Sequence, residues 1–411
     1  MKKIIILSLT TTSLLLAAGY KVPEQSLNSM ALGGAYVAHT PGADAAYFNP
    51  ANMAFLPDNQ MFEAGATFIH LPSNTFQGYQ ALSATEVYPA NGESEVENIV
   101  IPFLHYVANP MGDLRWGASL AVPSGVTKHW ESPYQKLFAE EFTLKVIELN
   151  PVLSYKVTDN FAIGGGARFI YSEGVVKSDG TAAGVPIKRE LEGDTIQYGY
   201  NLAMTYKPTG DINLAATYRS NIDLKEEGKA NLYLGGIGQQ YDADVTVPVP
   251  ATLSLAVSKT WVDHFTLELE YERTYWSTYD ELDFNYGSAI QPALIASYDD
   301  PESRDWEDTN TFRVGASVDV AEDTTFMLGF AKDEGPVKKS RLGYELPDSD
   351  GEIFSMGIRI QANENLAWGV AYLHDEKEGI SIDPGENQDG IIGSFSAGGA
   401  NLLTAGMTYK F

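Results

Sequence analysis

The 411-residue sequence contains no cysteine, which excludes a fold that depends on disulfide bonds. Basic residues are scarce, because 27 lysines and arginines accompany 54 aspartates and glutamates, for a net charge of −27. Phosphate backbones bind to basic surfaces, so nucleic acid is excluded as a partner. After residue 16 no apolar run is long enough for a membrane-spanning helix.

Motifs for catalysis and metal binding are also missing. The six histidines are scattered, no two of them have the spacing of a metal motif, and no Gly-x-Ser-x-Gly occurs. A hydrolytic site would need a nucleophile, a base and an orienting acid together. These absences predict that the protein is not an enzyme and uses no metal or other cofactor.

The N-terminus has the pattern of a secretory signal. Lys2 and Lys3 precede an apolar stretch over residues 4–16, and Ala17-Ala18-Gly19 provides a small-residue cleavage site. The stretch is short for a spanning helix. We therefore predict a signal peptide over residues 1–19, which leaves two classes for the exported chain: a soluble secreted protein or a membrane β-barrel.

The C-terminus favours the barrel. Apolar residues occupy every second position from Leu403 to the terminal Phe411, with small or polar residues between them. Such a strand suits closure of an outer-membrane barrel, in which one face meets lipid and the other meets the lumen. It also predicts an interaction of this strand with the barrel-assembly machinery.

Similar alternation recurs along the chain and predicts fourteen antiparallel strands. Their approximate ranges are 61–71, 98–108, 114–124, 143–157, 161–173, 195–207, 212–224, 250–261, 265–278, 309–320, 324–332, 352–361, 366–374 and 400–411. Every second connection is a tight polar turn, such as Thr158-Asp159-Asn160, and the others are longer. Short periplasmic turns alternating with long external loops are typical of outer-membrane barrels and not of soluble sandwiches. The predicted fold is an all-β, 14-stranded transmembrane barrel over residues 61–411, in a Gram-negative outer membrane.

Residues 20–60 precede the first predicted strand and contain many side chains that favour burial. These are Leu27, Met30, Leu32, Tyr36, Tyr47, Phe48 and Phe55. A fourteen-stranded barrel has a lumen that is either filled or used as a channel. We therefore predict a hatch inside the lumen, and a flexible periplasmic tail is the less suitable alternative.

The hatch region resembles that of the FadL/TodX family, outer-membrane transporters of long-chain fatty acids and other hydrophobic compounds. The resemblance rests on Ser29-Met30-Ala31-Leu32-Gly33-Gly34-Ala35-Tyr36 and on Asp44-Ala45-Ala46-Tyr47-Phe48-Asn49-Pro50-Ala51. Similar segments follow in the family's order, including Val122-Pro123-Ser124-Gly125-Val126 and Trp306-Glu307-Asp308-Thr309. They cover essentially the whole mature chain.

The resemblance implies a mechanism and several site residues. Cargo is captured at the external loops, enters a lumenal pocket and leaves sideways through a gap beside an inward kink in the third strand. The hatch triplet Asn49, Pro50 and Ala51 is expected to control gating, with Asn49 linking the hatch to the third strand. Kink candidates in the third strand are Gly117 and Pro123. Pro123 could equally mark the outer end of that strand. The family also suggests a monomer.

The external loops depart from the family pattern at residues 173–194. This stretch is short and rich in glycine, so a helical ligand groove is not expected there. Residues 232–237 or residues 129–142, with Trp130 and Phe138 at helical spacing, would take over ligand capture. A helix that simply packs on the barrel rim is the plainer interpretation of the second segment.

Strand parity directs four candidate arginines into the lumen: Arg168, Arg219, Arg313 and Arg359. Each could bind a fatty-acid carboxylate. Each could instead pair with a lumenal glutamate and brace the barrel, which is the commoner role of such residues. The many lumenal acids argue against an anionic cargo and leave neutral hydrocarbons open.

The predicted function is uptake of hydrophobic molecules, and a general diffusion porin for small polar solutes is the alternative. Predicted partners are the hydrophobic ligand, outer-membrane lipid and lipopolysaccharide, whose divalent cations the acidic external loops could hold. No loop is long enough for the external domain of an adhesin.

Overall fold

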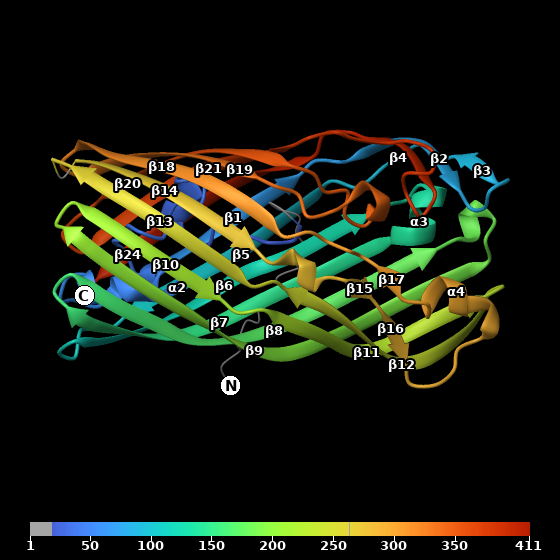
Figure 1. Cartoon of the computed structure of the whole chain (residues 1–411), viewed down its shortest axis with the longest axis horizontal. Coiled ribbons are helices and arrows are strands. Elements are labelled where there is room, and N and C mark those ends of the chain that lie inside the picture. Colours follow the sequence, from blue (N-terminus) through green and yellow to red (C-terminus); the bar gives the residue numbers. More distant parts are fainter. Residues whose placement is uncertain (1–18, 263) are drawn as a thin grey trace, which may run out of the picture.

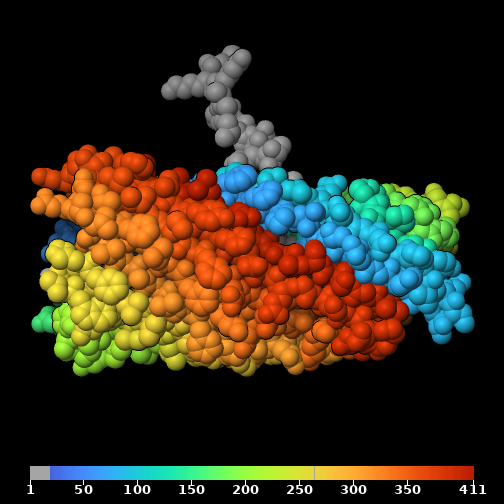
Figure 2. Space-filling view, turned by 90° about the horizontal axis from the view of Figure 1, so that it is seen from above, coloured from blue at the N-terminus to red at the C-terminus, as the bar shows by residue number. Residues whose placement is uncertain are grey.

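A computed structural model describes residues 19–262 and 264–411. The predicted signal peptide therefore lies outside the described residues, except for Gly19. Seventeen strand segments form one antiparallel sheet that closes on itself through pairing of β1 with β24. Figure 1 shows these strands tilted around a common axis, and Figure 2 shows the early strands (blue) lying beside the C-terminal strands (red).

The closed sheet is a fourteen-stranded barrel, as the sequence predicted. β10 with β11, and β12 with β13, each form one interrupted strand, and the short β16 is an addition to the edge of β12. The segments are β1 (Met61–Leu71), β5 (Glu97–Val107), β6 (Leu114–His129), β7 (Glu141–Thr158), β8 (Phe161–Asp179), β9 (Ile187–Thr209), β10 (Ile212–Arg219), β11 (Ile222–Leu234), β12 (Ile237–Val249), β13 (Thr252–Trp261), β14 (Phe265–Thr274), β16 (Phe284–Tyr286), β18 (Thr309–Ala321), β19 (Thr324–Asp333), β20 (Gly351–Gln361), β21 (Leu366–Lys377) and β24 (Gly399–Lys410).

The two ends of the barrel differ in the length of their connections. The tight turns and the C-terminus lie at one end, and the longer connections lie at the other (Figure 1). The long connections carry α3 (Pro133–Ala139), α4 (Ile295–Tyr298), the pair β15 (Glu281–Leu282) and β17 (Glu302–Ser303), and a small sheet. That sheet contains β2 (Thr75–Ala81), β3 (Val87–Pro89), β4 (Gly92–Glu93), β22 (Ile380–Ile382) and β23 (Ile391–Phe395).

Several predicted strands are too short, because the real strands continue beyond the membrane-facing alternation. β8 and β9 extend across most of residues 173–194, and a single 3₁₀ turn (Thr181–Ala183) joins them. Residues 232–237, predicted to be a ligand-capturing loop, are the tip of the β11–β12 hairpin, with the turn at Gly235-Gly236 in the left-handed region. The predicted strand 265–278 was too long, since it ends at Thr274.

The N-terminal segment forms little regular structure, and its residues are mostly buried. Its elements are α1 (Leu27–Ala31), α2 (Ala45–Phe48) and the 3₁₀ helix η1 (Pro50–Phe55). α1 contacts β19, β20, β21 and β24, whereas η1 contacts β6, β7, β8 and β9 on another arc of the wall. Segment 20–56 thus fills the inside of the barrel at the level of these strands.

Glycines in the wall permit the close approach of this segment. A Cβ on Gly164 would lie 2.6 Å from the backbone nitrogen of Ala51, and one on Gly329 would lie 2.1 Å from the carbonyl carbon of Leu32. Residues with side chains at these two positions would push the hatch away from the wall.

Candidate functional site

The wall of the barrel is interrupted between β5 and β6. These strands pair over only four positions, from Leu104 opposite Leu120 to Val107 opposite Gly117. Beyond them, β5 remains paired with β1 and β6 with β7, but not with each other. Residues 98–103 and 121–128 therefore border a break in the ladder, here called the wall break.

An irregularity in β6 lies at the wall break. The β6–β7 register shifts between Ala121 and Ser124, so Val122 and Pro123 are outside the ladder. Because β6 continues to His129, the alternative that Pro123 marks the end of the third barrel strand is wrong. Gly117 lies in the regular ladder, where a Cβ would be 2.7 Å from the Tyr106 carbonyl oxygen.

The N-terminal segment, and not β5, provides hydrogen bonds to this part of β6. Residues 20–25, here called the strap, run along it. Val22 N donates to Pro123 O (2.9 Å), and Gly125 N donates to Tyr20 O (2.8 Å). The Gln25 amide accepts from Val122 N (2.9 Å) and donates to Val122 O (2.8 Å). The strap thus satisfies backbone groups that a neighbouring strand would otherwise satisfy.

The hatch triplet forms a capped turn against a different part of the wall. Asn49 Oδ1 accepts from Ala51 N (3.1 Å), and Pro50 opens η1. Asn49 Nδ2 donates to Val37 O (2.8 Å) and to Thr205 Oγ1 (2.9 Å) on β9. The expected link from Asn49 to the third strand is therefore wrong, because its direct wall partner is the sixth barrel strand. The third strand is linked to the N-terminal segment through Gln25 and through Arg115, whose Nη1 donates to Met53 O (3.2 Å) and Leu56 O (3.0 Å).

A small cavity of about 70 Å³, the lumenal pocket, lies between the strap, the hatch and the wall. Its lining includes Lys21 and Val22 of the strap, Pro123 and Ser124 of β6, and Phe48 of the hatch. Ligand pockets usually measure roughly 300–1,000 Å³, so this pocket accommodates a large ligand only if the hatch moves.

The four candidate arginines are all paired with buried glutamates. Glu148 binds both Arg168 (2.9 Å) and Arg219, Glu272 binds Arg313 (3.3 Å), and Glu63 binds Arg359 (3.4 Å). Arg168, Arg219 and Arg313 nevertheless line the lumenal pocket, whereas Arg359 does not. Their ion pairs favour the bracing role over carboxylate binding.

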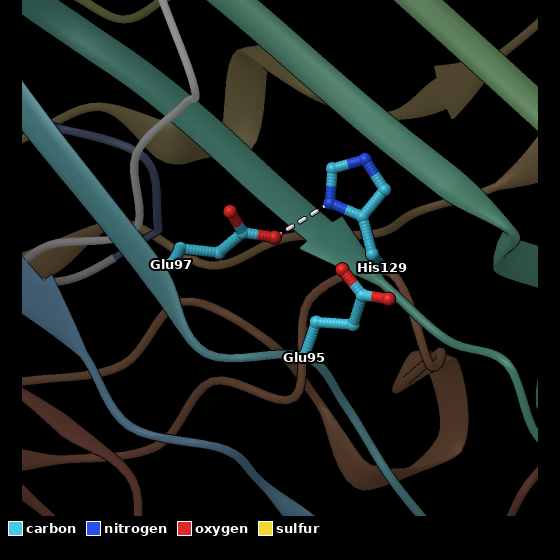
Figure 3. Close-up of side chains that lie close together, drawn as sticks. All are labelled: Glu95, Glu97 and His129. Atoms are coloured by element: carbon cyan, nitrogen blue, oxygen red, sulfur yellow. Dashed lines mark hydrogen bonds and ion pairs between the residues drawn. The ribbon is translucent and has the colours of Figure 1, made fainter.

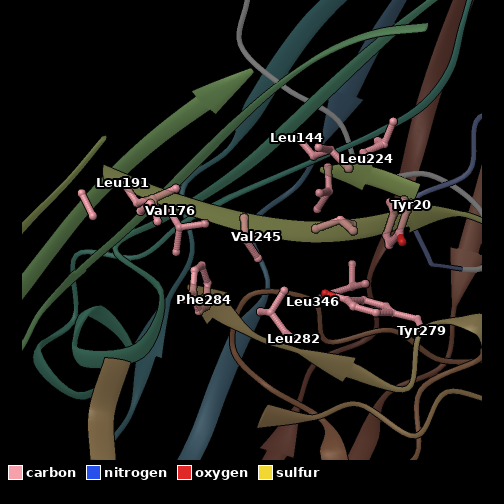
Figure 4. Close-up of a cluster of buried hydrophobic side chains, with 14 of the residues drawn as sticks. Tyr20, Leu144, Val176, Leu191, Leu224, Val245, Tyr279, Leu282, Phe284 and Leu346 are labelled. Atoms are coloured by element: carbon pink, nitrogen blue, oxygen red, sulfur yellow. The ribbon is translucent and has the colours of Figure 1, made fainter. Parts of the chain in front are cut away.

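Between the lumenal pocket and the long loops, the inside of the barrel is mainly apolar, with Glu226 as a buried charged residue among the apolar side chains. Figure 4 shows part of this buried cluster, which extends from Tyr20 of the strap past Leu144 and Val245 to Phe284. The alternating strands predicted small or polar residues on the lumenal face, and that prediction is wrong for the half of the barrel nearer the long loops. The extended strand ends there direct leucine and valine inward.

The apolar cluster continues into a cavity of about 740 Å³ among the long loops, here called the outer cavity. Phe138 lines it from α3 and is 37% exposed. Trp130 does not line it, because its ring is fully buried and Nε1 donates to Tyr344 O (2.9 Å). The predicted loop helix is therefore present, with Trp130 anchoring its base and Phe138 facing the cavity.

Arg189 of β9 also lines the outer cavity, and sequence reasoning did not identify it. Its guanidinium lies 4.2 Å from the ring centre of Phe284 and 5.0 Å from that of Tyr298. Although the residue is buried, its Nε and Nη1 form no hydrogen bond with any described residue. Arg304 in the same cavity is neutralised by Glu302 (3.1 Å) and Glu345.

Comparison with known proteins supplies the identity. The sequence model of the family described as "Outer membrane protein transport protein (OMPP1/FadL/TodX)" matches residues 8–411. The chain belongs to the OMPP1/FadL/TodX family. It is thus a protein of the outer membrane of Gram-negative bacteria.

Relatives of this family member match over almost their full length. A long-chain fatty acid transport protein of Escherichia coli O6:H1 is 25% identical, over 96% of this chain and 95% of its own. The solved structure of a Pseudomonas aeruginosa FadL homologue has a TM-score of 0.81 at 20% identity, covering 95% and 99% of the two chains. The Pseudomonas putida toluene transporter TodX has a TM-score of 0.69 at 17% identity, covering 94% and 98%. These structures share the fold.

A signal for Arg189 was present in the sequence. In β9 the odd-numbered residues Asn201, Ala203 and Thr205 face inward, and Arg189 and Leu191 have the same parity. Extending the alternation upstream through the glycine-rich segment would have identified both residues as inward-facing.

Proposed function

We propose that this protein carries hydrophobic molecules from the outer cavity, through the lumenal pocket, and sideways into the membrane through the wall break. The main observation in support of this route is the cluster of apolar side chains that extends from the outer cavity to the strap. A general diffusion porin needs a polar, water-filled lumen, so this lining disfavours the porin alternative. The names of the relatives, a fatty-acid transporter and a toluene transporter, support a hydrophobic cargo.

Lateral exit suits such a cargo. Entering the periplasm would expose apolar surface at a cost of about 0.8 kcal/mol per CH₂ group, whereas passage through the wall keeps that surface out of water. The lumenal pocket adjoins Pro123 and Ser124 at the wall break, and among the described residues it is the strap that occupies the β6 edge there. Release of the strap would both enlarge the pocket and uncover the exit.

The hatch triplet contributes by keeping the rest of the plug in position while the strap moves. Asn49, Pro50 and Ala51 belong to a turn that is hydrogen-bonded to β9 and β7 and not to residues 121–128 of β6. Gating would then require separation of the strap from β6, without loss of the whole hatch.

Among possible cargoes, Arg189 favours amphipathic carboxylates such as long-chain fatty acids. A buried guanidinium with two unpaired nitrogens can gain two charge-assisted hydrogen bonds from a carboxylate. The surrounding rings of Phe284 and Tyr298 would contact the first methylene groups. A neutral hydrocarbon would use the apolar lining alone.

The other proposed partners follow from the position of the barrel in the outer membrane. The outward-facing apolar side chains meet lipid, the acidic loops adjoin lipopolysaccharide and its cations, and the strand ending in Phe411 is the segment offered to the barrel-assembly machinery. The protein acts as a monomer and carries out no chemical step on its cargo.

The test is binding of oleate and of toluene to detergent-purified protein, with mass spectrometry of any co-purified molecule. We expect oleate binding, reduced at least tenfold in Arg189→Ala and partly retained in Arg189→Lys. Arg273→Ala is the matched control, because Arg273 pairs with Asp308 and lines neither cavity. Toluene binding without oleate binding would make the cargo a hydrocarbon, and permeation of sugars in place of either would support the porin alternative.

A further inference from the structure

The outer end of the wall break is closed by a cluster of side chains separate from the transport route. Glu95 N donates to His129 O (2.9 Å), and Ser94 pairs with Trp130, so the chain before β5 rejoins the end of β6. This crossing brings the carboxylates of Glu95 and Glu97 next to the His129 imidazole (Figure 3). One ligand atom from each of the three residues lies within 4.8 Å of the others.

We propose that Glu95, Glu97 and His129 bind a divalent transition-metal ion, zinc by preference, which fastens β5 to β6 at the outer end of the wall break. Two carboxylate oxygens and one imidazole nitrogen are a ligand set that zinc accepts, with water completing the shell. Calcium and magnesium take oxygen ligands, so the imidazole favours a transition metal.

The geometry needs only side-chain rotation to reach a metal shell. Ligand atoms about 2.0–2.2 Å from zinc lie about 3.3–3.6 Å from one another in a tetrahedron. Glu97 Oε1 and His129 Nδ1 are now 2.6 Å apart and would separate slightly, while the exposed Glu95 would move inward. Because Glu95 is exposed and the His129 side chain is 25% exposed, the site is open to ions from outside.

A carboxylate that can accept a hydrogen bond from the other nitrogen of the His129 ring is already in position. His129 Nε2 lies 3.5 Å from Glu141 Oε1, which orients the ring so that Nδ1 faces the two glutamates. Metal-bound histidines commonly donate their second N–H to such a carboxylate. Lys177 holds the other oxygen of Glu141 (2.8 Å), and the nearby Lys128 ammonium donates to Asn74 (2.6 Å), so neither lysine occupies the site.

Without metal, His129 bridges the carboxylates of Glu97 and Glu141. Hydrogen bonds to Glu141 and Glu97 raise the pKa of His129 to about 10. The alternative to a metal site is therefore specific: a protonated histidine that bridges two carboxylates and binds no metal.

The experiment is calorimetric titration of zinc into the full-length protein in detergent, purified without a histidine tag and in the presence of excess calcium. We expect one ion per chain, and affinity at least tenfold weaker in Glu97→Gln and in His129→Ala. Glu95→Gln changes an exposed residue, so it keeps the test valid if the buried variants fold poorly. His374→Ala is the control, because His374 binds Asn401 on another part of the rim.

Thermal unfolding tests whether the bound ion fastens β5 to β6. Zinc should raise the thermal unfolding temperature of the wild type and of His374→Ala, but not of Glu95→Gln. Absence of zinc binding in the wild type, or equal binding in all variants, would overturn the proposal and leave the protonated bridge as the role of the cluster.

Discussion

Two seams of the barrel wall, meaning contacts between neighbouring strands, differ in which segments of the chain provide their hydrogen bonds. The seam between β1 and β24 has ten paired positions, from Met61 opposite Lys410 to His70 opposite Asn401. The seam between β5 and β6 has four, and the strap serves the edge of β6 where β5 does not. A seam made of two strands cannot open without unfolding the barrel, but one completed by the strap can open when that segment moves.

The composition of the strands matches this difference. β5 contains Pro102 and β6 contains Pro123, whereas β1 and β24 contain no proline. Proline lacks the backbone N–H that a ladder needs, so it is tolerated where a strand edge is not paired. Pro151 of β7 and Pro248 of β12 lie in paired ladders, so proline alone does not identify the incomplete seam.

The largest effect should come from converting the open seam into a closed one. Lys21 and Ser124 are antiparallel bridge partners, a geometry whose Cα separation suits a disulfide. We expect the disulfide in Lys21→Cys/Ser124→Cys to lower uptake more than tenfold, while oleate binding to the purified protein persists. A reducing agent that breaks the disulfide should restore uptake.

Because the chain has no cysteine of its own, the cross-link is unambiguous. Thr67→Cys/Thr404→Cys is the matched control on the closed seam, where these residues are register partners. Uptake that survives the strap cross-link, or that is lost equally in the control, would refute the lateral route.

The next effect should be a loss of stability at the closed seam. Glu63 is fully buried there and binds Arg359 and Thr408 (2.9 Å). Removing one partner of a buried pair costs about 3–5 kcal/mol. We expect Glu63→Gln to lower unfolding stability by about this amount, measured by denaturant titration, with uptake per folded molecule unchanged. A change in transport without a change in stability would contradict the distinction between the seams.

A smaller effect is expected from loosening the strap. Gln25→Ala removes both hydrogen bonds between Gln25 and the Val122 backbone. The Val122 N–H and carbonyl then lose these partners, which lowers the free energy of unfolding by about 1–3 kcal/mol. We expect a modest decrease in the thermal unfolding temperature together with increased conductance in planar bilayers. Asn98→Ala on β5 is a control for general damage near the break. Unchanged conductance would mean that the strap does not seal the break.

The smallest effect should follow Pro123→Ala. The Pro123 carbonyl keeps its bond to Val22, and the register shift is held by neighbouring pairs, so the break should persist. Restoring backbone freedom in the unfolded chain costs roughly 0.4–1 kcal/mol. We expect uptake to change less than twofold, and a large loss would show that the proline itself sets the kink.

Much of the architecture could be predicted from local pattern. The alternation of apolar residues gave the strand number and the lipid-facing side chains, since side-chain direction in a strand follows sequence parity. The predictions failed where that pattern changed, as in β9, where Arg189 and Leu191 lie beyond the lipid-facing stretch and the strand continues through Gly193. Local sequence cannot show where a strand stops contacting lipid.

The sequence by itself determined the strand count, the alternation of short and long connections and the outer-membrane class, because these depend on periodicity and composition. Only the tertiary structure decided that β5 leaves part of the third strand unpaired and that the strap fills the gap. It also decided that the four candidate arginines pair with glutamates, whereas Arg189 forms no ion pair with any described residue. Those features depend on contacts between residues far apart in the chain, such as Gln25 with Val122 and Arg189 with Phe284. Parity gives the direction of a side chain, but closure of the barrel decides what it meets.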